Sequence, residues 1–516
     1  MSSSPSARLD DPPDSPDGKA GAGQALAFPA SYAQERMWFF YRLNPQDSSY
    51  NVPLLLRLTG DLNPTALHAA LNDLIARHET LRTTFAESDS GLQQIVGLQQ
   101  IVAEHLVLPL PTIDVSTLLA GRPESPFTEH EGVRTRLLEE IRRPFNLEDG
   151  PLLRTRLVRL CPTEHCLLVC VHHIVIDGWS GGVLVRELAQ AYRARLSGAA
   201  PVWTPLEIQY GDYAEWQRGT LDGQPLAEGL AYWRQRLAGE LPVLRLPTDR
   251  PPLQRRTFVG DRLDFTLSPE LTTAIKELRR DQGATLHMVL LTGFAALLHR
   301  YSGQDDILVG SPTANRDNPQ IKPLIGLFVN ILPLRVDTSG NPSFAELLHR
   351  VRDVSLRAFA HQHIPLGKIV EEVAPQRDPS GNPLFRVIFA LQKIDRPDIE
   401  LPGLTISLVY ALDLRSCLFD LELHLWEQRD ALRGILVFAT DLFDRHTAER
   451  MVDQLRRVFE AVTPNPQRRL ADLPLATGQD QAHLANGLAE GSPTTGRARS
   501  RPGSHGRQQP GRRSSR

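Results

Sequence analysis

Two hydrophobic periods alternate along the central part of the chain, and together they indicate a mixed α/β protein. The segment LLLRLTG is followed by NPTALHAALNDLIARHE, where Asn63 can cap a helix and Pro64 suits its first turn. The apolar residues of this helix recur every three or four positions: Leu67, Leu71, Leu74 and Ile75. The pattern predicts a strand followed by a capped helix.

A hairpin and a second helix follow farther along the chain. The runs LLRTRLVRL and CLLVCVHH flank the turn-like segment CPTEH, which predicts two antiparallel strands. The next segment, GWSGGVLVRELAQAYRARLSG, has a helical stripe, and Ser180 can cap it. Its apolar residues are Leu184, Leu188, Tyr192 and Leu196. This stretch therefore predicts strand, turn, strand and helix.

A second round of strands and helices begins near residue 255. LDFTLSPELTTAIKELRRDQG predicts a strand and a helix that starts at Ser268 and Pro269. TLHMVLLTGFAALLHRYSG predicts a buried helix, and DILVGSP a short strand. Further helices are expected at 343–361 and 445–463, among strands near 385–392, 405–411, 419–426 and 433–439. The two rounds predict two α/β lobes.

These lobes divide the chain. We expect an N-terminal lobe at 27–200, a Trp- and Pro-rich crossover at 201–254 and a C-terminal lobe at 255–477. Residues 1–26 and the basic tail 478–516 are poor in apolar residues and are predicted to be disordered.

Composition and charge restrict the function. The chain has 516 residues and no run of 18 apolar residues, which argues against a membrane span. Its N-terminus is acidic and Pro-rich and lacks the apolar segment of a secretory signal peptide, so we expect a cytoplasmic protein that does not bind membranes. The net charge is −3, but residues 491–516 hold seven Arg and no Lys, Asp or Glu, which leaves about −10 on the rest. We therefore expect no nucleic-acid partner.

The chemistry concentrates in VHHIVIDGWS, residues 171–180. A histidine at a strand end titrates near neutrality and can accept a proton from an attacking amine. Asp177 needs an arginine partner if it is buried, and Gly178 permits a turn or the close approach of a substrate. The nearby cysteines raise the possibility of a zinc site. A strand would place Cys166, Cys170 and His172 on one face and His173 on the other, so we predict no metal site.

HHIVIDGWS resembles the core motif of nonribosomal peptide synthetase condensation domains, relatives of the chloramphenicol acetyltransferase fold. Six further segments resemble the family's motifs in the right order, and together they cover about residues 27–475: SYAQERMWFF, ARHETLRTTF, YGDYAEWQR, LIGLFVNILPLR, HQHIPLGKIVEEV and RDPSGNPLFRVIF. The resemblance implies two chloramphenicol acetyltransferase-like α/β lobes in a V-shaped pseudo-dimer with a central tunnel.

The resemblance also implies a reaction. An acceptor amine on one peptidyl carrier protein attacks a donor acyl thioester on another, and His173 either removes the amine proton or positions the amine. Both roles need a neutral imidazole. The substrates arrive on phosphopantetheine arms, and the chain itself binds no cofactor. The implied partners are donor and acceptor carriers and other synthetase modules, with the chain itself a monomer.

Further site residues follow from matching positions. His172 is expected to be structural, and Gly178 to leave room for the pantetheine arm. The expected partner of Asp177 is Arg335, or else Arg77 or Arg82. Ser311 either lines the tunnel or is a turn residue at a strand end. Asn330 and Trp179 complete the expected support of the tunnel, and core or interface packing is expected for Trp38, Trp179 and Trp216. We expect Tyr210, Asp212 and Tyr213 to brace the crossover.

Two features differ from a complete synthetase module. The sixth motif usually reads Pro-Phe-Glu, but here Pro365 precedes Leu366 and Gly367. The sequence contains neither a Gly-rich ATP-binding loop nor a serine motif for pantetheine attachment, so carriers are expected from other chains. Two alternatives remain open: a catalytically silent module that docks carriers or tailoring enzymes, and a carrier-independent acyl-CoA acyltransferase.

Overall fold

The computed structural model describes residues 25–88, 97–119, 130–251, 253, 256–373, 384–392, 399–409 and 417–474. The disorder predicted for 1–26 and 478–516 therefore falls outside the described residues, except at residues 25 and 26. Among the described helices, none combines the length and the apolar character needed to cross a bilayer.

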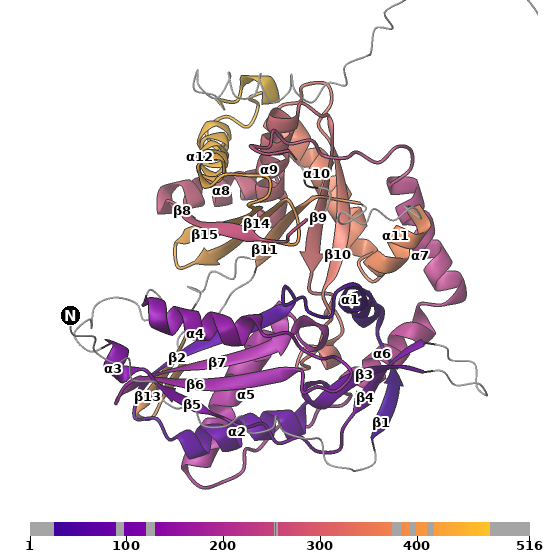
Figure 1. The fold of residues 1–516 in the computed structure, drawn as a ribbon. Helices are drawn as coiled ribbons and strands as arrows, with labels where there is room; N and C mark the ends of the chain where they lie inside the picture. Colours follow the sequence, from indigo (N-terminus) through magenta and orange to yellow (C-terminus); the bar gives the residue numbers. More distant parts are fainter. Residues whose placement is uncertain are drawn as a thin grey trace, which may run out of the picture. The chain divides into compact units, whose positions relative to one another are not determined.

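The first lobe is built on a six-stranded sheet with the order β12-β13-β2-β7-β6-β5 (Figure 1). Its strands are β2 (Asn51–Gly60), β5 (Thr112–Asp114), β6 (Leu153–Cys161), β7 (Glu164–His172), β12 (Ile399–Leu401) and β13 (Leu404–Leu408). The antiparallel pairing of β6 with β7 confirms the predicted hairpin. Every residue of β7 after Glu164 is buried, so both faces of this central strand are covered.

Helices and a small second sheet complete this lobe. The helices are α1 (Tyr32–Leu43), α2 (Pro64–Arg77), α3 (Ser116–Leu119), α4 (Glu131–Arg142) and α5 (Gly178–Leu196). The small sheet has the order β1-β4-β3, from β1 (Leu26–Pro29), β3 (Thr83–Ser88) and β4 (Gly97–Val102). As predicted, the side chain of Asn63 caps α2, where it accepts a hydrogen bond from the backbone N–H of Ala66, and Pro64 stands in the first turn.

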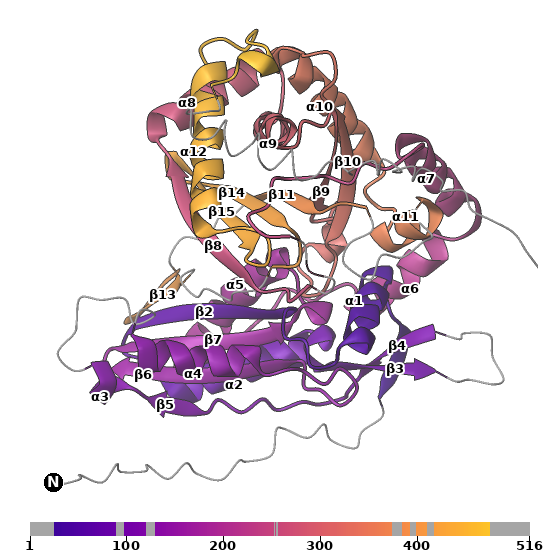
Figure 2. The same ribbon diagram turned by 45° about the horizontal axis from the view of Figure 1, so that its top comes forward.

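The second lobe has its own six-stranded sheet, with the order β10-β9-β11-β14-β15-β8. Its strands are β8 (Gly260–Leu267), β9 (Asp306–Thr313), β10 (Asn330–Asp337), β11 (Val387–Gln392), β14 (Leu421–Gln428) and β15 (Ala431–Ala439). The helices are α8 (Pro269–Asp281), α9 (Leu286–Ser302), α10 (Phe344–Ala360), α11 (Leu366–Val373) and α12 (Arg445–Val462). Figure 2 looks along α9, which lies among α8, α10 and α12 above the sheet. The two sheets with their helices confirm the predicted pair of α/β lobes.

One predicted boundary is wrong in detail. The strand expected near 405–411 was assigned to the C-terminal lobe, but β13 pairs with β2 at the edge of the first sheet. Leu401, Leu404 and Ile406 are buried in the core of the first lobe. An alternating apolar pattern identifies a strand but not its partner, so the sequence did not show that residues 399–408 return to the first lobe.

The crossover contains α6 (Tyr210–Thr220) and α7 (Gly223–Arg236). The hydroxyl group of Tyr210 lies 2.8 Å from Ser31 Oγ and donates to the carbonyl oxygen of Leu327 at 2.7 Å. The rings of Tyr210 and Tyr213 both pack against Phe328 of the second lobe. These two tyrosines therefore brace the crossover, as predicted.

Candidate active site

The two histidines lie at the end of β7 and have different surroundings. The strand ends at His172, and His173 begins the short 3-10 helix η3 (His173–Val175). Nδ1 of His172 accepts a hydrogen bond from the backbone N–H of Ile174 at 3.1 Å, and its buried ring packs near Tyr50 and Phe145. Burial lowers the pKa of His172 to about 3. This neutral, fixed ring fits the structural role predicted for His172.

His173 is only partly buried. Its backbone N–H donates to the carbonyl oxygen of Tyr50 at 2.8 Å. Its Nδ1 is buried and has no hydrogen-bond partner among the described residues, so Nε2 is the ring nitrogen that a substrate can reach. Burial holds the pKa of His173 below its ordinary value; Arg36 lowers it further, while Asp177 acts in the opposite sense. The imidazole is therefore neutral near pH 7.

Asp177 connects residues 173–177, the histidine loop, to the second lobe. It is the N-cap residue of α5, and its Oδ1 accepts hydrogen bonds from the backbone N–H of Ser180 at 2.8 Å and from Ser180 Oγ at 2.7 Å. Its Oδ2 accepts a hydrogen bond from the backbone N–H of Phe328 at 3.1 Å. Asp177, rather than Ser180 as predicted, thus caps the helix, because its carboxylate accepts from the backbone N–H of Ser180 in the first turn, which has no acceptor within the helix.

The charged partner of Asp177 is Arg316, not Arg335, Arg77 or Arg82. Nη2 of Arg316 lies 3.1 Å from Oδ1 and 3.2 Å from Oδ2 of Asp177, and the two side chains are 1% and 2% exposed. Nη1 of Arg316 donates to the carbonyl oxygens of Ile321 and Leu324 at 2.7 and 2.8 Å. The prediction of an arginine partner is confirmed, while the identity of the residue is corrected.

The three arginines expected at this position serve elsewhere. Arg335 pairs with Asp306 on the neighbouring strand and donates to two carbonyl oxygens of the segment after α7. Arg77 pairs with Glu187 of α5, and Arg82 donates to the carbonyl oxygens of Ala103, Ile75 and Ala76. Each finds acceptors close to its own element, which leaves the buried carboxylate to Arg316.

Ser180 extends the same network across the lobes. Its hydroxyl group donates to Asp177 and accepts hydrogen bonds from Arg316 Nη2 at 2.7 Å and from the backbone N–H of Gly326 at 3.1 Å. A Cβ atom at Gly326 would lie 2.1 Å from the ring of Tyr210. The second-lobe segment 324–328 thus packs tightly against the start of α5, directly after the histidine loop.

The remaining predicted site residues are Gly178, Asn330 and Ser311. A Cβ atom at Gly178 would meet nothing within 4 Å, so the described residues leave space there. Asn330 is structural: its Nδ2 donates to the carbonyl oxygens of Gln362 and Ile364, and its Oδ1 accepts from the N–H of Leu366. Ser311 is buried, and its Oγ lies 2.9 Å from Nε2 of His287.

The tryptophan predictions are only partly right. Trp38 is buried, as expected. Trp216 is 58% exposed, so the packing expected for it is wrong, whereas Trp179 is 44% exposed but lies at the contact between the lobes, which was one of the two places expected for it. The indole N–H of Trp179 donates to the carbonyl oxygen of Lys322 at 3.0 Å, so this ring is held at the surface of the lobe contact. A large apolar ring favours burial in general, but its position on a helix face decides the outcome.

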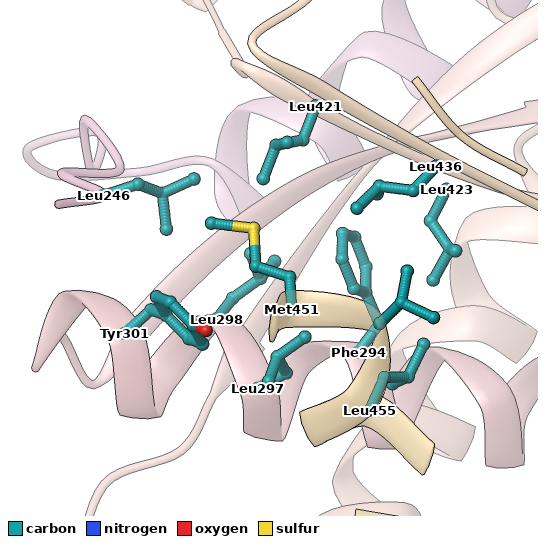
Figure 3. A pocket seen from close by; sticks show the side chains of 11 residues that line it. Leu246, Phe294, Leu297, Leu298, Tyr301, Leu421, Leu423, Leu436, Met451 and Leu455 are labelled. Atoms are coloured by element: carbon teal, nitrogen blue, oxygen red, sulfur yellow. The ribbon is translucent and has the colours of Figure 1, made fainter. Parts of the chain in front are cut away.

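A cavity in the second lobe is too small to be a substrate site. It lies between α9, α12 and the sheet, and Figure 3 shows its apolar lining, which includes Phe294, Met451 and Leu455. Its free volume is about 10 Å³, space for about one water molecule. It contains none of the predicted site residues.

Comparison with known proteins identifies the family. The model of the condensation domain matches residues 25–485. The chain belongs to the condensation-domain family. This condensation domain is 40% identical over 469 residues to a linear gramicidin synthase of Brevibacillus parabrevis. The match covers 90% of the chain but only 9% of that relative, so the chain spans a small part of the synthetase.

Solved structures agree with the fold. The X-domain from teicoplanin biosynthesis, in its complex with OxyB, is 30% identical, with a TM-score of 0.77; the match covers 89% of this chain and 98% of the X-domain. The condensation domain of the monacolin K polyketide synthase MokA is 21% identical, with a TM-score of 0.74 and coverage of 87% and 100%. The condensation-domain fold predicted from the motifs is thereby confirmed.

The departure at the sixth motif leaves the second lobe well packed. Leu366 begins α11 and is buried, and its N–H donates to Oδ1 of Asn330 at 3.0 Å. A Cβ atom at Gly367 would have nothing within 4 Å. Leucine therefore occupies the usual phenylalanine position as a core residue.

Proposed function

We propose that this condensation domain forms an amide bond between an acyl thioester on a donor carrier protein and the amine of an aminoacyl thioester on an acceptor carrier. The observation that carries the proposal is the geometry of His173. Its imidazole is neutral, and its Nδ1 is buried, which leaves Nε2 for a substrate. The ring directly follows β7, which pairs with β2 on one side and with β6 on the other.

In the proposed reaction the acceptor amine attacks the carbonyl carbon of the donor thioester. A C–N bond forms, the C–S bond breaks, and the donor pantetheine leaves as a thiol once it has gained a proton. As a base, Nε2 of His173 accepts the proton that the amine nitrogen loses, which requires the neutral ring to carry its own proton on Nδ1, near the backbone groups of His173 and Ile176 that raise its pKa. Alternatively, the ring holds the amine in line with the carbonyl carbon. General-base catalysis would contribute about 10² to 10⁴ in rate, and positioning of two tethered reactants can contribute as much.

Asp177 and Arg316 support this chemistry as a scaffold. Both oxygens of the carboxylate are occupied by Arg316, by backbone N–H groups and by Ser180, so it has no free position for a substrate proton. The ion pair fixes the loop between His173 and α5 relative to the second lobe.

The proposal is tested by mass spectrometry of the acceptor carrier's pantetheine arm after mixing with a loaded donor carrier. We expect amide product with the wild type and none with His173→Ala. His105→Ala is the matched control, because His105 has an exposed side chain outside the motif, and it should keep the wild-type yield. Absence of product with the wild type over a panel of donors and acceptors would contradict the proposal.

A second candidate function is docking without catalysis, which the similarity to the X-domain in complex with OxyB favours. The same experiment separates the two. A silent docking module would bind loaded carriers or a tailoring enzyme equally well with and without His173, and neither protein would give product. Replacing the donor carrier by free acyl-CoA tests the carrier-independent alternative in the same assay.

A further inference from the structure

A carboxylate and a histidine form a hydrogen-bonded pair on β14 of the second lobe. Oε2 of Glu422 lies 3.2 Å from Nε2 of His424, and the two side chains are 16% and 23% exposed. Nδ1 of His424 lies 3.2 Å from the amide nitrogen of Gln392 on β11. Both residues of the pair stand outside the seven motif segments, so the family motifs do not account for them.

The hydrogen bonds determine where the charge of this pair lies. An amide nitrogen only donates, so Nδ1 of His424 accepts from Gln392, and the proton of the ring is on Nε2. This proton is donated to Oε2 of Glu422, because a carboxylate only accepts. The imidazole is therefore neutral, and the pair carries one negative charge.

The charge of Glu422 has no cationic partner within the described part of the chain. The carboxylate contacts His424, the backbone N–H of Leu418 at 3.1 Å and the thiol group of Cys417 at 3.9 Å, and none of these is a lysine or an arginine. A partly buried carboxylate without a counter-charge is costly, because water solvates it incompletely. The site therefore favours a ligand that brings a positive charge.

The pair is on the face of the second sheet that is turned away from the helices of this lobe. Leu421 and Leu423, its neighbours on β14, line the small cavity beside α9 and α12. Because successive side chains of a strand point to opposite faces, Glu422 and His424 point away from these helices. In Figures 1 and 2 the first lobe lies on that side of the sheet. The carboxylate therefore points toward the first lobe.

The pair is also near the edge of the sheet at which the second lobe reaches the histidine loop. β11 runs parallel to both β9 and β14, and its residue Ile388 is aligned with Gly310 on one side and with Glu422 on the other. The three strands therefore run toward the same edge of the sheet. β10, which is antiparallel to β9, begins at this edge, just after the segment 324–328.

Tyr50 of the first lobe connects this carboxylate to His173. The carbonyl oxygen of Tyr50 accepts a hydrogen bond from the backbone N–H of His173 at 2.8 Å. Burial raises the pKa of the Tyr50 phenol, and Arg36 lowers it. Asp47 and Glu422 raise it further. Glu422 is thus within electrostatic range of a residue that is bonded to His173, although it belongs to the other lobe.

We infer that Glu422 and His424 form a subsite for the positively charged side chain of a carrier-bound aminoacyl substrate. An ammonium group donates a charge-assisted hydrogen bond to the carboxylate, and such bonds are stronger than neutral ones. Ile435 and Val437 of β15 are opposite the pair on the same face and are partly exposed. They offer apolar surface for the methylene groups of such a side chain. The inference rests on the proposed function, because it requires an aminoacyl substrate near His173.

The test compares lysine with norleucine, which has the same carbon chain without the ammonium group, in amide formation with loaded carriers. In one arm the two residues are loaded on the acceptor carrier and in the other on the donor carrier, with alanine on the opposite carrier. For the wild type we expect kcat/KM to be about tenfold higher or more with lysine in one arm, which is the effect of a hydrogen bond to a charged group. The arm that shows the preference identifies the substrate.

Glu422→Gln removes the charge but keeps an oxygen that can accept from the N–H of Leu418. We expect lysine and norleucine to become equivalent in this variant, and amide product from norleucine shows that the variant is folded. Glu427→Gln is the matched control, because Glu427 is an exposed residue of the same strand that pairs with Lys276. This control should keep the wild-type preference for lysine.

Equal kcat/KM values for lysine and norleucine in both arms of the wild type would overturn the subsite, and so would a preference that persists in Glu422→Gln. Titration calorimetry of the loaded carriers adds a measurement that needs no amide formation. If the wild type forms no amide but binds the lysyl carrier more tightly than the norleucyl carrier, and Glu422→Gln does not, the proposed function fails and the subsite stands. Equal binding of both carriers without amide formation would overturn both.

Discussion

Arg316 holds both carboxylate oxygens of Asp177 across the contact between the lobes, at 3.1 and 3.2 Å. The two residues are 139 positions apart, and both side chains are buried. Charges removed from water are costly unless they are paired and hydrogen-bonded. Here backbone groups and Ser180 bind the other polar atoms of the pair, except Nε of Arg316, which is buried without a partner among the described residues. Because Arg316 belongs to the second lobe and Asp177 ends the histidine loop, the ion pair fixes the loop against the second lobe.

The first prediction concerns this pair. Arg316→Met leaves the Asp177 carboxylate buried without its counter-charge, and we expect the free energy of unfolding to fall by about 3 to 5 kcal/mol. Arg280→Met is the matched control, because its pair with Glu277 is exposed, and such pairs contribute about 0 to 1 kcal/mol. Urea denaturation measures both changes. Equal small losses in the two variants would show that the buried pair is not needed for stability.

The local features of the fold could be predicted because neighbouring residues determine them. The caps of α2 and α8 lie where the sequence placed them, at Asn63 and Ser268, each just before a proline in the first helical turn. The hairpin of β6 and β7 also depends on a short turn and two adjacent apolar runs. Spacing and turn chemistry are sufficient for such elements.

The long-range partners could not be predicted in the same way. A buried aspartate requires an arginine, but the sequence offers many, and the family motifs drew attention to Arg335, Arg77 and Arg82. Arg316 stands in the loop after β9, within VGSPTANRDN, and only the folded chain brings it to Asp177. The return of β13 to the first sheet depends on tertiary packing for the same reason.

The second prediction uses the low pKa of His172. Its folded value is about 3, whereas an unfolded histidine titrates near 6.5. Below pH 6.5 this histidine binds a proton in the unfolded chain but not in the folded protein, so the free energy of unfolding falls as the pH decreases. At pH 5 this residue should cost about 2 kcal/mol relative to pH 7.5.

His172→Asn tests this effect, because its amide oxygen can still accept from the backbone N–H of Ile174 but does not titrate. Denaturation at pH 7.5 and pH 5 should show an acid loss about 2 kcal/mol smaller in the variant than in the wild type. His105→Asn, at an exposed position, should keep the wild-type pH dependence. The same acid loss in all three proteins would rule out the buried neutral ring.

The third prediction concerns the field at His173. Arg36 on α1 lowers the pKa of His173, so Arg36→Met should raise it, and the acid limb of the pH dependence of kcat/KM should move to higher pH. Asp177 acts in the opposite sense. The control is Arg42→Met, an exposed position on the same helix. If the acid limb moves equally in both variants, or in neither, the pH dependence of kcat/KM is not set by the protonation of His173.

The last prediction tests the contact between the segment 324–328 and the crossover. A Cβ atom at Gly326 would lie 2.1 Å from the Tyr210 ring, whose hydroxyl group is bound to Leu327 and Ser31, so the ring cannot move without breaking these hydrogen bonds. Overpacking of this kind costs about 1 to 3 kcal/mol, and we expect Gly326→Ala to destabilise the protein by at least that amount.

Gly367→Ala is the control, since the added methyl group has open space in α11 and alanine favours the helix by up to about 1 kcal/mol. Because the N–H of Gly326 also binds Ser180 beside Asp177, amide formation should fall in Gly326→Ala and not in Gly367→Ala. A Gly326→Ala protein with wild-type stability and rate would mean that the lobes can separate at this point without disturbing His173.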